Sequence, residues 1–183
     1  MSGPEARAAE AITLGPDNTL MTGSIAYAVL GKYKAHFKTF HGTVTLERAS
    51  GQVQSVYLEI QAASIKSNCA ACDRAARSRR LLNTARYPKI TFKSDKIWKV
   101  VGKSKVLGTL EMHGVRKRIG SPFTVKVYDD SKRHRRSIDL KGQWVLNRKD
   151  FNIKWNRYLD HGGVLVGDTF TVDWWIRLKL DEH

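Results

Sequence analysis

The chain has 183 residues, of which 32 are Lys or Arg and 17 are Asp or Glu, so its formal net charge is +15. This length suits one domain with a sizeable core, and no run approaches the roughly 18 apolar residues of a membrane span. The basic surface should attract anionic partners such as phospholipid headgroups, prenyl phosphates or nucleic acid, although a charge excess that only aids solubility explains it equally well.

Alternation of apolar and polar residues predicts most of the secondary structure after residue 19. Residues 1–19 lack this pattern, and we expect a poorly ordered N-terminal extension there, followed by a single domain over residues 20–183. Successive side chains of a strand point to opposite sides, so alternation indicates a sheet with one dry face. The first three runs have these inward positions: Ile25, Tyr27 and Val29; Val44 and Leu46; and Val56, Leu58 and Ile60.

A helix is expected between the third and fourth strands, at residues 68–83. Asn68 can cap its first turn. One helical face, expected to pack on the sheet, carries Ala71, Ala75, Ser78 and Leu82. Pro88 ends this connection, because proline pushes the preceding Tyr87 towards an extended conformation.

Five further alternating runs complete the predicted sheet. Their apolar positions are Ile90 and Phe92; Val106, Leu110 and Met112; Phe123, Val125 and Val127; Ile138, Leu140, Trp144 and Leu146; and Phe170, Val172, Trp174, Ile176, Leu178 and Leu180. Eight strands are the number at which a closed barrel encloses side chains or one small ligand. We therefore predict an all-β fold, an eight-stranded antiparallel barrel with one short helix in the crossing between the third and fourth strands.

Cys69 and Cys72 form a CxxC pair with three interpretations: a local disulfide or two inert thiols, a redox pair, or part of a metal site. The redox interpretation expects a βαβ context, and zinc needs four N or S ligands. The sequence has no second CxxC, so a metal site would need His36, His41 or His113 to converge on the pair. We take Cys69 and Cys72 as a disulfide candidate and expect no metal site.

No grouping of residues in the sequence indicates catalysis. His113 lies near a strand end without a Ser/His/Asp or paired-carboxylate arrangement, so structural hydrogen bonding is its expected role. Gly162 and Gly163 lack the strand-to-helix context of a phosphate-binding loop and indicate a turn. We expect a protein that is not an enzyme and has no cofactor, although an isoprenoid, quinone or fatty-acid-like ligand could occupy its interior.

Five segments together carry a family resemblance that extends from about residue 20 to residue 180. They are FKTFHGTV at 37–44, ASIK at 63–66, YPKITFKS at 87–94, GTLEMHGV at 108–115 and NRKDFNIKW at 147–155. In this order and at these spacings, they resemble the YceI-like, lipocalin-like family of isoprenoid-binding proteins. The resemblance implies an extended lipocalin-like barrel whose apolar tunnel holds a polyprenyl or fatty amphiphile, without enzymatic activity.

The inward positions and the resemblance together predict a ligand-binding site. Its lining residues are expected to be Tyr27, Phe37, Phe40, Leu58, Ile60, Leu81, Leu82, Phe92, Leu110, Met112, Phe123, Trp144, Phe151, Trp155, Phe170 and Trp174. The long connections 63–88 and 148–167 can form lids, with Leu81, Leu82, Phe151 and Trp155 at the mouth and Arg74 or Arg77 as headgroup candidates. Alternatively, the two leucines only anchor the helix and Trp155 plugs the barrel end.

The expected function is binding or carriage of a long-chain isoprenoid or similar amphiphilic lipid. The alternative is a basic adaptor that binds anionic membrane or nucleic acid through the basic clusters at 74–80, 116–118 and 132–136. These clusters lack interleaved aromatic residues, so we expect a lipid ligand or an anionic membrane surface as partner rather than nucleic acid, and a homodimer stays open. The resemblance implies a periplasmic or other extracytoplasmic location. The first residues lack the apolar core of a signal peptide, so a cytoplasmic location stays open too.

Overall fold

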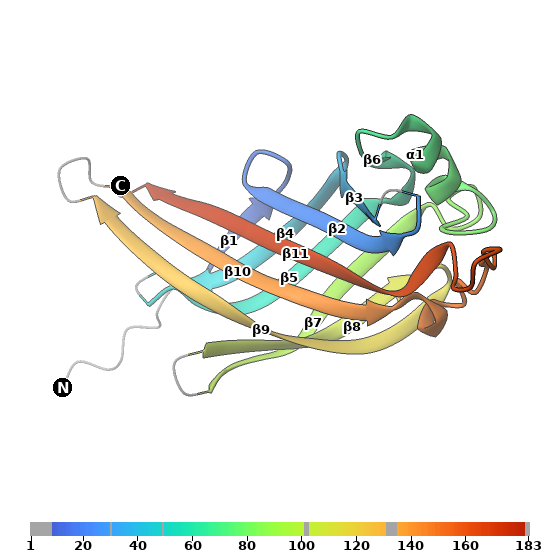
Figure 1. Cartoon of the computed structure of the whole chain (residues 1–183). Coiled ribbons are helices and arrows are strands. Elements are labelled where there is room, and N and C mark those ends of the chain that lie inside the picture. Colours follow the sequence, from blue (N-terminus) through green and yellow to red (C-terminus); the bar gives the residue numbers. More distant parts are fainter. Residues whose placement is uncertain (1–8, 30, 49, 101–102, 131–134, 182–183) are drawn as a thin grey trace, which may run out of the picture.

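A computed structural model of the chain describes residues 9–29, 31–48, 50–100, 103–130 and 135–181. Within these ranges one antiparallel sheet of eleven strands curls into an open, lipocalin-like barrel (Figure 1). The strands are β1 (Ala9–Leu14), β2 (Thr19–Tyr27), β3 (Gly31–Phe37), β4 (Phe40–Glu47), β5 (Gln52–Gln61), β6 (Ile65–Lys66), β7 (Lys89–Val100), β8 (Lys103–Met112), β9 (Val115–Asp130), β10 (Arg135–Asn147) and β11 (Val166–Asp181). The helices are α1 (Ala70–Arg77) and two short 3-10 helices, η1 (Ala62–Ser64) and η2 (Arg148–Phe151).

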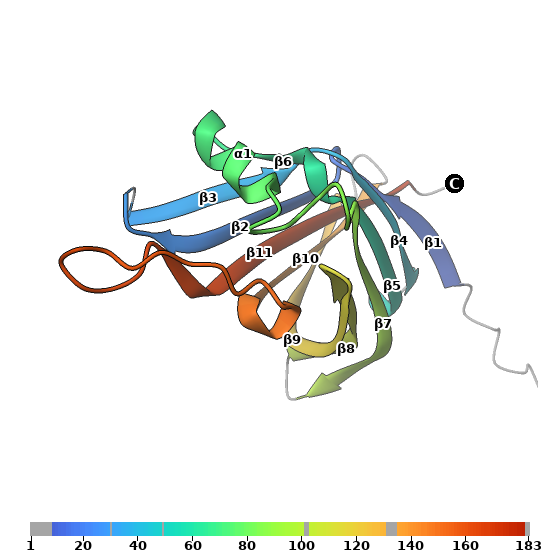
Figure 2. The same ribbon diagram turned by 90° about the vertical axis from the view of Figure 1, so that its right-hand side faces the viewer.

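The sheet runs in the order β1-β4-β5-β7-β8-β9-β10-β11-β2-β3-β6. Figure 2 looks at the barrel from the end where α1 lies, and shows the sheet curling from β1 and β4 round to β2 and β3. The strands β9, β10 and β11, of 16, 13 and 16 residues, form the long wall of the barrel. The predicted antiparallel lipocalin-like fold is therefore confirmed, but the count of eight strands is not.

Three strands were missing from the predicted set of eight. In β3, Tyr33, Ala35 and Phe37 do alternate, but the run is short and rich in lysine, so its apolar signal is weak. The two residues of β6 are too few for any periodicity. In β1, which falls in the region expected to be a poorly ordered extension, Leu14 is fully buried and the strand pairs with β4. Residues 1–8 of that extension lie outside the described residues.

The interior is solid at one end of the barrel and hollow at the other. At the end of β11 that points away from α1, the filled end, Ile176, Leu178 and Leu180 are buried against Ile138 and Leu140 of β10. Towards α1, at what we call the hollow end, Phe170, Val172 and Trp174 continue the same inward row but are only partly buried. The alternation thus predicted the inward face correctly, and burial along β11 tells the two ends apart.

Two predicted inward valines are exceptions to this pattern. Val29 is exposed because β2 ends at Tyr27, which leaves Val29 in the turn to β3. Val127 of β9 is 38% exposed. Periodicity alone does not report where a strand leaves the core.

The helix is shorter than predicted and buries a different face. It begins after Cys69, whose Sγ accepts a hydrogen bond from the Cys72 N–H, so Cys69 rather than Asn68 is the N-cap. Its buried residues are Asp73 and Ala76, whereas the predicted inward residues Ala71 and Ala75 are exposed. The predicted face was wrong because it did not include Asp73, which the structure supplies with hydrogen-bond partners that allow its burial.

Candidate functional site

An apolar cavity occupies the hollow end. Its volume is about 190 Å³. An apolar cavity of about 150 Å³ already holds a benzene molecule, so this one can take a larger apolar group. Its lining residues are Met21, Gly23, Ser24, Ile25, Tyr33, Ala35, Phe37, Ile60, Ile65, Ala76, Leu81, Leu82, Ile90, Leu110, Met112, Trp144, Leu146, Arg148, Ile153, Val166, Phe170 and Val172.

A smaller compartment of about 40 Å³ lies deeper in the barrel, towards the filled end. Met21 and Trp144 line both spaces and so form the partition between them. The small compartment is otherwise lined by Leu14, Thr19, Val53, Val56, Leu58, Phe92, Ile97, Val106, Phe123, Leu140, Trp174 and Ile176. Movement of the Met21 or Trp144 side chain would join the two spaces into one longer tunnel.

A row of aromatic rings crosses the barrel at this partition. The ring centroids of Phe92 and Trp144 are 5.0 Å apart, those of Trp144 and Trp174 are 5.7 Å apart, and those of Trp174 and Phe123 are 5.8 Å apart. The indole N–H groups of Trp144 and Trp174 are buried and have no hydrogen-bond partner in the described part of the chain. Both indole rings therefore line the small compartment, and the N–H group of each is free to donate a hydrogen bond.

Two glycines make room for this aromatic row. A Cβ at Gly142 would lie 2.2 Å from an atom of the Trp174 ring, and a Cβ at Gly108 would lie 2.6 Å from the Phe92 ring. Both glycines occupy inward positions, opposite Trp174 on β11 and next to the Leu110–Phe92 pair respectively. The Trp174 and Phe92 rings therefore lie close against the sheet at these glycines.

Among the described residues that line the cavity, Arg148 of η2 is the one that carries a charge, and only 3% of its surface is exposed. Its guanidinium donates to the carbonyl oxygens of Gly167 (2.8 Å), Ile153 (2.7 Å) and Trp155 (2.8 Å). A further N–H reaches the carboxylate of Asp168 at 3.1 Å. Arg148 therefore ties both ends of the connection 148–167 together beneath the mouth.

The carboxylate of Asp168 is shared between two cations. Lys149 donates to it at 2.6 Å, and this hydrogen bond, together with the charges of Lys149 and Arg148, lowers the pKa of Asp168. Asp168 is thus held ionised and completes the surroundings of the buried Arg148. The charge of Arg148 is therefore paired on the side away from the cavity.

Asp73 fixes α1 over the hollow end. Only 1% of its surface is exposed, and its carboxylate accepts hydrogen bonds from Tyr33 Oη (2.9 Å) of β3 and from Ser67 Oγ (2.6 Å) and the Ser67 N–H (3.1 Å). Burial opposes ionisation of Asp73, but these hydrogen bonds and the nearby Lys66 outweigh it and lower its pKa. Burial and the hydrogen bond to Asp73 raise the pKa of Tyr33 far above its usual range. Tyr33 lines the cavity, and so does Ala76, which lies one helical turn after Asp73. The hydrogen bonds of Asp73 therefore position part of the cavity wall.

The two long connections meet over the cavity, although not through all of the residues expected at the mouth. Leu81 and Leu82 line the cavity, as expected. Phe151 is fully buried in the core, and Ile153 takes the place at the wall. Trp155 lies under Arg80, whose guanidinium is 5.3 Å from the ring centroid, so this pair joins the two connections outside the cavity.

The sixteen predicted lining residues divide into three groups. The large cavity is lined by Phe37, Ile60, Leu81, Leu82, Leu110, Met112, Trp144 and Phe170. The small compartment is lined by Leu58, Phe92, Phe123 and Trp174, in addition to Trp144. Neither space is lined by Tyr27, Phe40, Phe151 or Trp155: Phe40 and Phe151 are core residues, while Tyr27 pairs with Val166 at the end of β2.

The two headgroup candidates do not reach the cavity wall. Arg74 is exposed on α1, and the Arg77 guanidinium donates to the Ile65 carbonyl oxygen at 3.1 Å. The charged residue that does reach the wall, Arg148, was missed because a buried arginine has no periodic signature. Tyr33 and Ala35 were missed with their strand, whereas Ile25, Ile90, Leu146 and Val172 already belonged to the predicted inward rows.

The other sequence-predicted features have structural places. The sulfurs of Cys69 and Cys72 form a disulfide across the start of α1. His113 Nδ1 is 2.9 Å from the Phe151 carbonyl oxygen and its ring packs on Tyr87, so it has structural partners. Among the described residues, no group of three or more His, Cys, Asp or Glu side chains could hold a metal ion, and no helix is long and apolar enough to cross a membrane.

The basic clusters differ in their surroundings. Arg116 pairs with Glu111 and Arg118 pairs with Asp95. In the third cluster, Arg136 pairs with Asp129, while residues 132–134 lie outside the described residues. Part of the basic excess is therefore neutralised locally by carboxylates.

Comparisons with known proteins agree with this architecture. The protein YceI of Escherichia coli O157:H7 is 30% identical over 118 residues, which cover 64% of this chain and 62% of that protein. The crystal structure of Burkholderia cenocepacia BcnA superposes with a TM-score of 0.72 at 19% identity, covering 87% of this chain and 96% of BcnA. A polyisoprenoid-binding domain from Saccharophagus degradans, implicated in plant cell wall breakdown, gives 0.58 at 14% identity over 90% of this chain and 94% of that domain.

A sequence model of the YceI-like domain matches residues 13–178. The match begins within β1 and ends within β11, so it includes the strands that line the cavity, the helix α1 and the two long connections. The chain spans 62% of the length of the curated E. coli relative. With the family match extending over nearly the whole barrel, the chain belongs to the YceI-like domain family.

Proposed function

We propose that this protein binds and carries a long-chain isoprenoid or similar amphiphilic lipid, as a carrier and not as an enzyme. The observation that carries the proposal is the apolar cavity of about 190 Å³ that continues, behind Met21 and Trp144, into a second apolar compartment. Two spaces in line suit an elongated apolar chain better than a compact ligand. The Saccharophagus degradans domain, which shares the fold, is described as polyisoprenoid-binding, and this likeness supports the proposal.

The wall chemistry indicates which part of the ligand lies inside. Each Å² of apolar ligand surface moved from water to such a wall contributes about 25 cal/mol before ordering costs. The cationic side chain of the wall, Arg148, lies at the mouth side of the cavity and already has carbonyl and carboxylate partners. We therefore place the hydrocarbon chain inside and the polar end of the lipid towards the connections 63–88 and 148–167.

The test is native mass spectrometry of the gently purified full chain, followed by organic extraction, for the wild type and two matched variants. Val172→Phe adds bulk at a cavity-lining position, whereas Val145→Phe adds the same bulk on the outer face, where Val145 is 61% exposed. We expect Val172→Phe to lower retained lipid per folded molecule several-fold with little change in Tm, because the cavity has room for the ring. Val145→Phe should retain as much lipid as the wild type. Equal lipid content in all three proteins, or no extractable lipid in the wild type, would refute the proposal.

We also propose that the protein works outside the cytoplasm. Disulfides form and persist in oxidising compartments such as the periplasm, and the Cys69–Cys72 bond supports this location. Alkylation of the protein in intact cells before and after reduction tests it. Extracytoplasmic protein should be alkylated at both cysteines only after reduction, and full alkylation without reduction would contradict the proposal.

A further inference from the structure

Two neighbouring loops at the hollow end expose large apolar side chains. Val29, in the turn from β2 to β3, is 69% exposed, and Tyr158 and Val164, in the connection before β11, are 84% and 40% exposed. The loops are joined, because the Ala28 N–H donates to the Leu165 carbonyl oxygen at 2.9 Å. Figure 2 shows the orange-red loop projecting beside the hairpin of β2 and β3. We call residues 28–29 and 157–165 the tip.

The tip is a defined structure that projects into solvent. Tyr158 and Val164 face each other in a β-bridge, and the chain turns between them at Gly162 and Gly163, whose φ angles are 85° and 88°. A Cβ at either glycine would contact nothing within 4 Å. The other large apolar residues that the structure shows as exposed lie singly or in pairs on strands: Leu20, Tyr57, Val127, Tyr128 and Val145. Scattered apolar residues need no explanation, whereas a projecting apolar group at one end does.

Cationic side chains accompany the tip. Arg157 lies in it, Lys32 lies in the adjoining hairpin, and Arg79 and Arg80 lie in the connection that meets Trp155. All four residues are exposed, and within the described ranges none has a carboxylate oxygen within 4.0 Å. The paired arginines of the 116–118 cluster provide the contrast. Cations without a carboxylate partner around exposed apolar groups match the chemistry of an anionic lipid surface, which offers both phosphate charge and hydrocarbon.

The tip adjoins the cavity wall along the chain. Val166, the residue after the tip, lines the cavity, and so does Leu81, the residue after Arg80. On the side of β2, Ile25 lines the cavity three residues before Ala28. A bilayer that received the tip would therefore face the cavity mouth, and a lipid chain could pass between them with little exposure to water.

From these observations we propose that the tip docks the protein on an anionic phospholipid bilayer. Val29, Tyr158 and Val164 enter the headgroup boundary, where the amphipathic ring of tyrosine is favoured, and Arg157, Arg79 and Arg80 contact phosphates. The significance of the docking rests on the proposed carrier function, because it brings the cavity mouth to the source or destination of the ligand. The docking itself is a separate physical claim.

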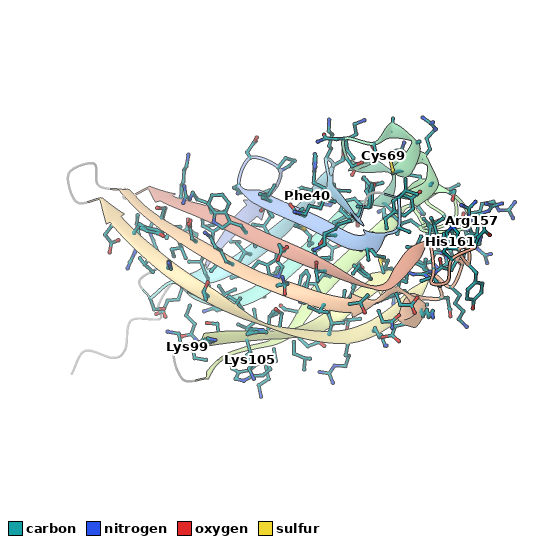
Figure 3. All side chains as sticks on the ribbon, viewed as in Figure 1. Phe40, Cys69, Lys99, Lys105, Arg157 and His161 are labelled. Carbon is teal, nitrogen blue, oxygen red and sulfur yellow. A yellow bond between two sulfur atoms is a disulfide. The ribbon has the colours of Figure 1, made fainter. Side chains whose placement is uncertain are left out.

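The experiment measures co-sedimentation of the full chain with vesicles of phosphatidylglycerol and phosphatidylcholine over a salt series. The charge variant Arg79→Gln/Arg157→Gln is compared with Lys99→Gln/Lys105→Gln, which has the same net charge but alters exposed lysines at the opposite end of the barrel (Figure 3). We expect the first pair to weaken vesicle binding about 25-fold, because each of the two cations near the surface contributes a factor of about five. The second pair should bind like the wild type. Equal losses in both pairs would overturn the proposal, since they would reflect net charge alone.

A second comparison tests the apolar part. Tyr158→Ser/Val164→Ser should weaken vesicle binding about tenfold at high salt, where the charge contribution is screened, whereas Tyr57→Ser/Val145→Ser on the strands should not. Light scattering in the absence of vesicles tests whether a second copy of the chain, rather than a bilayer, covers the tip. If the wild type is a dimer and the tip variant a monomer, the tip is an interface between copies and the proposal fails. Binding of the tip to duplex DNA, without binding to vesicles, would also overturn it.

Extraction of lipid from the same preparations separates the two claims. A wild type that holds lipid but never sediments with vesicles refutes the docking and leaves the carrier function standing. A wild type that sediments with vesicles through its tip but holds no lipid refutes the carrier function and leaves the docking standing.

Discussion

Gly142 and Trp174 face each other across β10 and β11 on the inward side of the sheet, and the absence of a Cβ on one allows the ring of the other to lie flat. Gly108 lies diagonal to Phe92 in the register of β8 and β7 and likewise leaves room for the Phe92 ring. These pairs keep the Trp174 and Phe92 rings close to the sheet, where they line the small compartment. Adding one carbon at either glycine should therefore displace the aromatic rings at the partition between the two compartments.

We predict that Gly142→Ala destabilises the protein by about 1–3 kcal/mol, the usual range for overpacking a well-packed interior. The added Cβ would lie 2.2 Å from the Trp174 ring, which must move. Urea denaturation gives the loss, and near-UV circular dichroism should show the altered tryptophan environment. Gly120→Ala is the control, because its Cβ would meet its nearest neighbour at 3.4 Å. A loss as large for Gly120→Ala would contradict this explanation.

The two neighbours Arg148 and Lys149 give a second test, because they share the carboxylate of Asp168 but differ in burial. Arg148→Met should cost about 3 kcal/mol or more, since the carbonyls of Ile153, Trp155 and Gly167 lose their buried donor. Lys149→Met, with half of the lysine side chain exposed, should cost less than about 1 kcal/mol. Thermal denaturation of both variants measures the two losses of stability. Similar losses would mean that the Arg148 guanidinium does not hold the connection 148–167 in place.

At the scale of elements, β10 and β11 are held together on their outer face by an ion pair whose carboxylate is buried and whose arginine is partly exposed. Arg177 donates two hydrogen bonds of 2.8 Å to Asp139, directly opposite it in the register, and only 2% of Asp139 is exposed. The hydrogen bond from Arg177 lowers the pKa of Asp139, against the opposing effect of burial. Folding therefore favours the ionised form of this carboxyl group.

We predict that this pair contributes to stability above about pH 4, the usual pKa of an unfolded aspartate, and that the contribution is lost as pH falls through the lowered pKa of the folded state. Asp139→Asn should be less stable than the wild type at pH 7, and the difference should shrink between pH 4 and pH 2. Urea midpoints over this range measure it. Asp129→Asn, which alters a more exposed pair with Arg136, should change stability by less than about 0.5 kcal/mol throughout. A pH-independent deficit of Asp139→Asn would contradict the ionic explanation.

The elements also show what sequence can and cannot predict. The inward row of β11 could be predicted because six bulky apolar residues alternate with mostly polar ones, and a strand has no other way to bury them. The strand β3 could not, because lysines occupy its outer positions and only three moderately apolar residues its inner ones. In α1, the buried face depends on Asp73, and only the tertiary structure supplies Tyr33 and Ser67 as its partners.

The candidate site was predictable to the same extent as the strands that build it. Ile60, Leu110 and Phe170 line the cavity because alternation puts them inside. Phe151 and Trp155 were expected there as aromatic residues of a long connection, yet loops have no periodicity that orients side chains. Arg148 could not be predicted for a different reason. Its burial depends on the backbone carbonyl groups of Ile153 and Trp155, whose positions cannot be derived from the sequence.

At the scale of the whole molecule, the contrast between the filled and hollow ends predicts a gradient of local stability along the same strands. Backbone amides of β10 and β11 near Ile138 and Leu178 should exchange with deuterium much more slowly than those near Leu146 and Phe170, because local opening costs more where apolar packing is complete. Hydrogen exchange with mass spectrometry measures this gradient. Added lipid should slow exchange at the hollow end only, and uniform exchange along β11 would contradict the division.

This division also bears on how the family can diverge. Substitutions in the cavity wall, for instance at Val172 or Ile25, alter the size and shape of the space, while Leu178, Ile138 and their neighbours continue to hold the sheet together. Single substitutions in the cavity wall can then change which ligand is preferred while the protein stays folded at every step. Distantly related barrels of this shape are accordingly expected to differ most in the cargo they accept, and least in the packing at the opposite end of their strands.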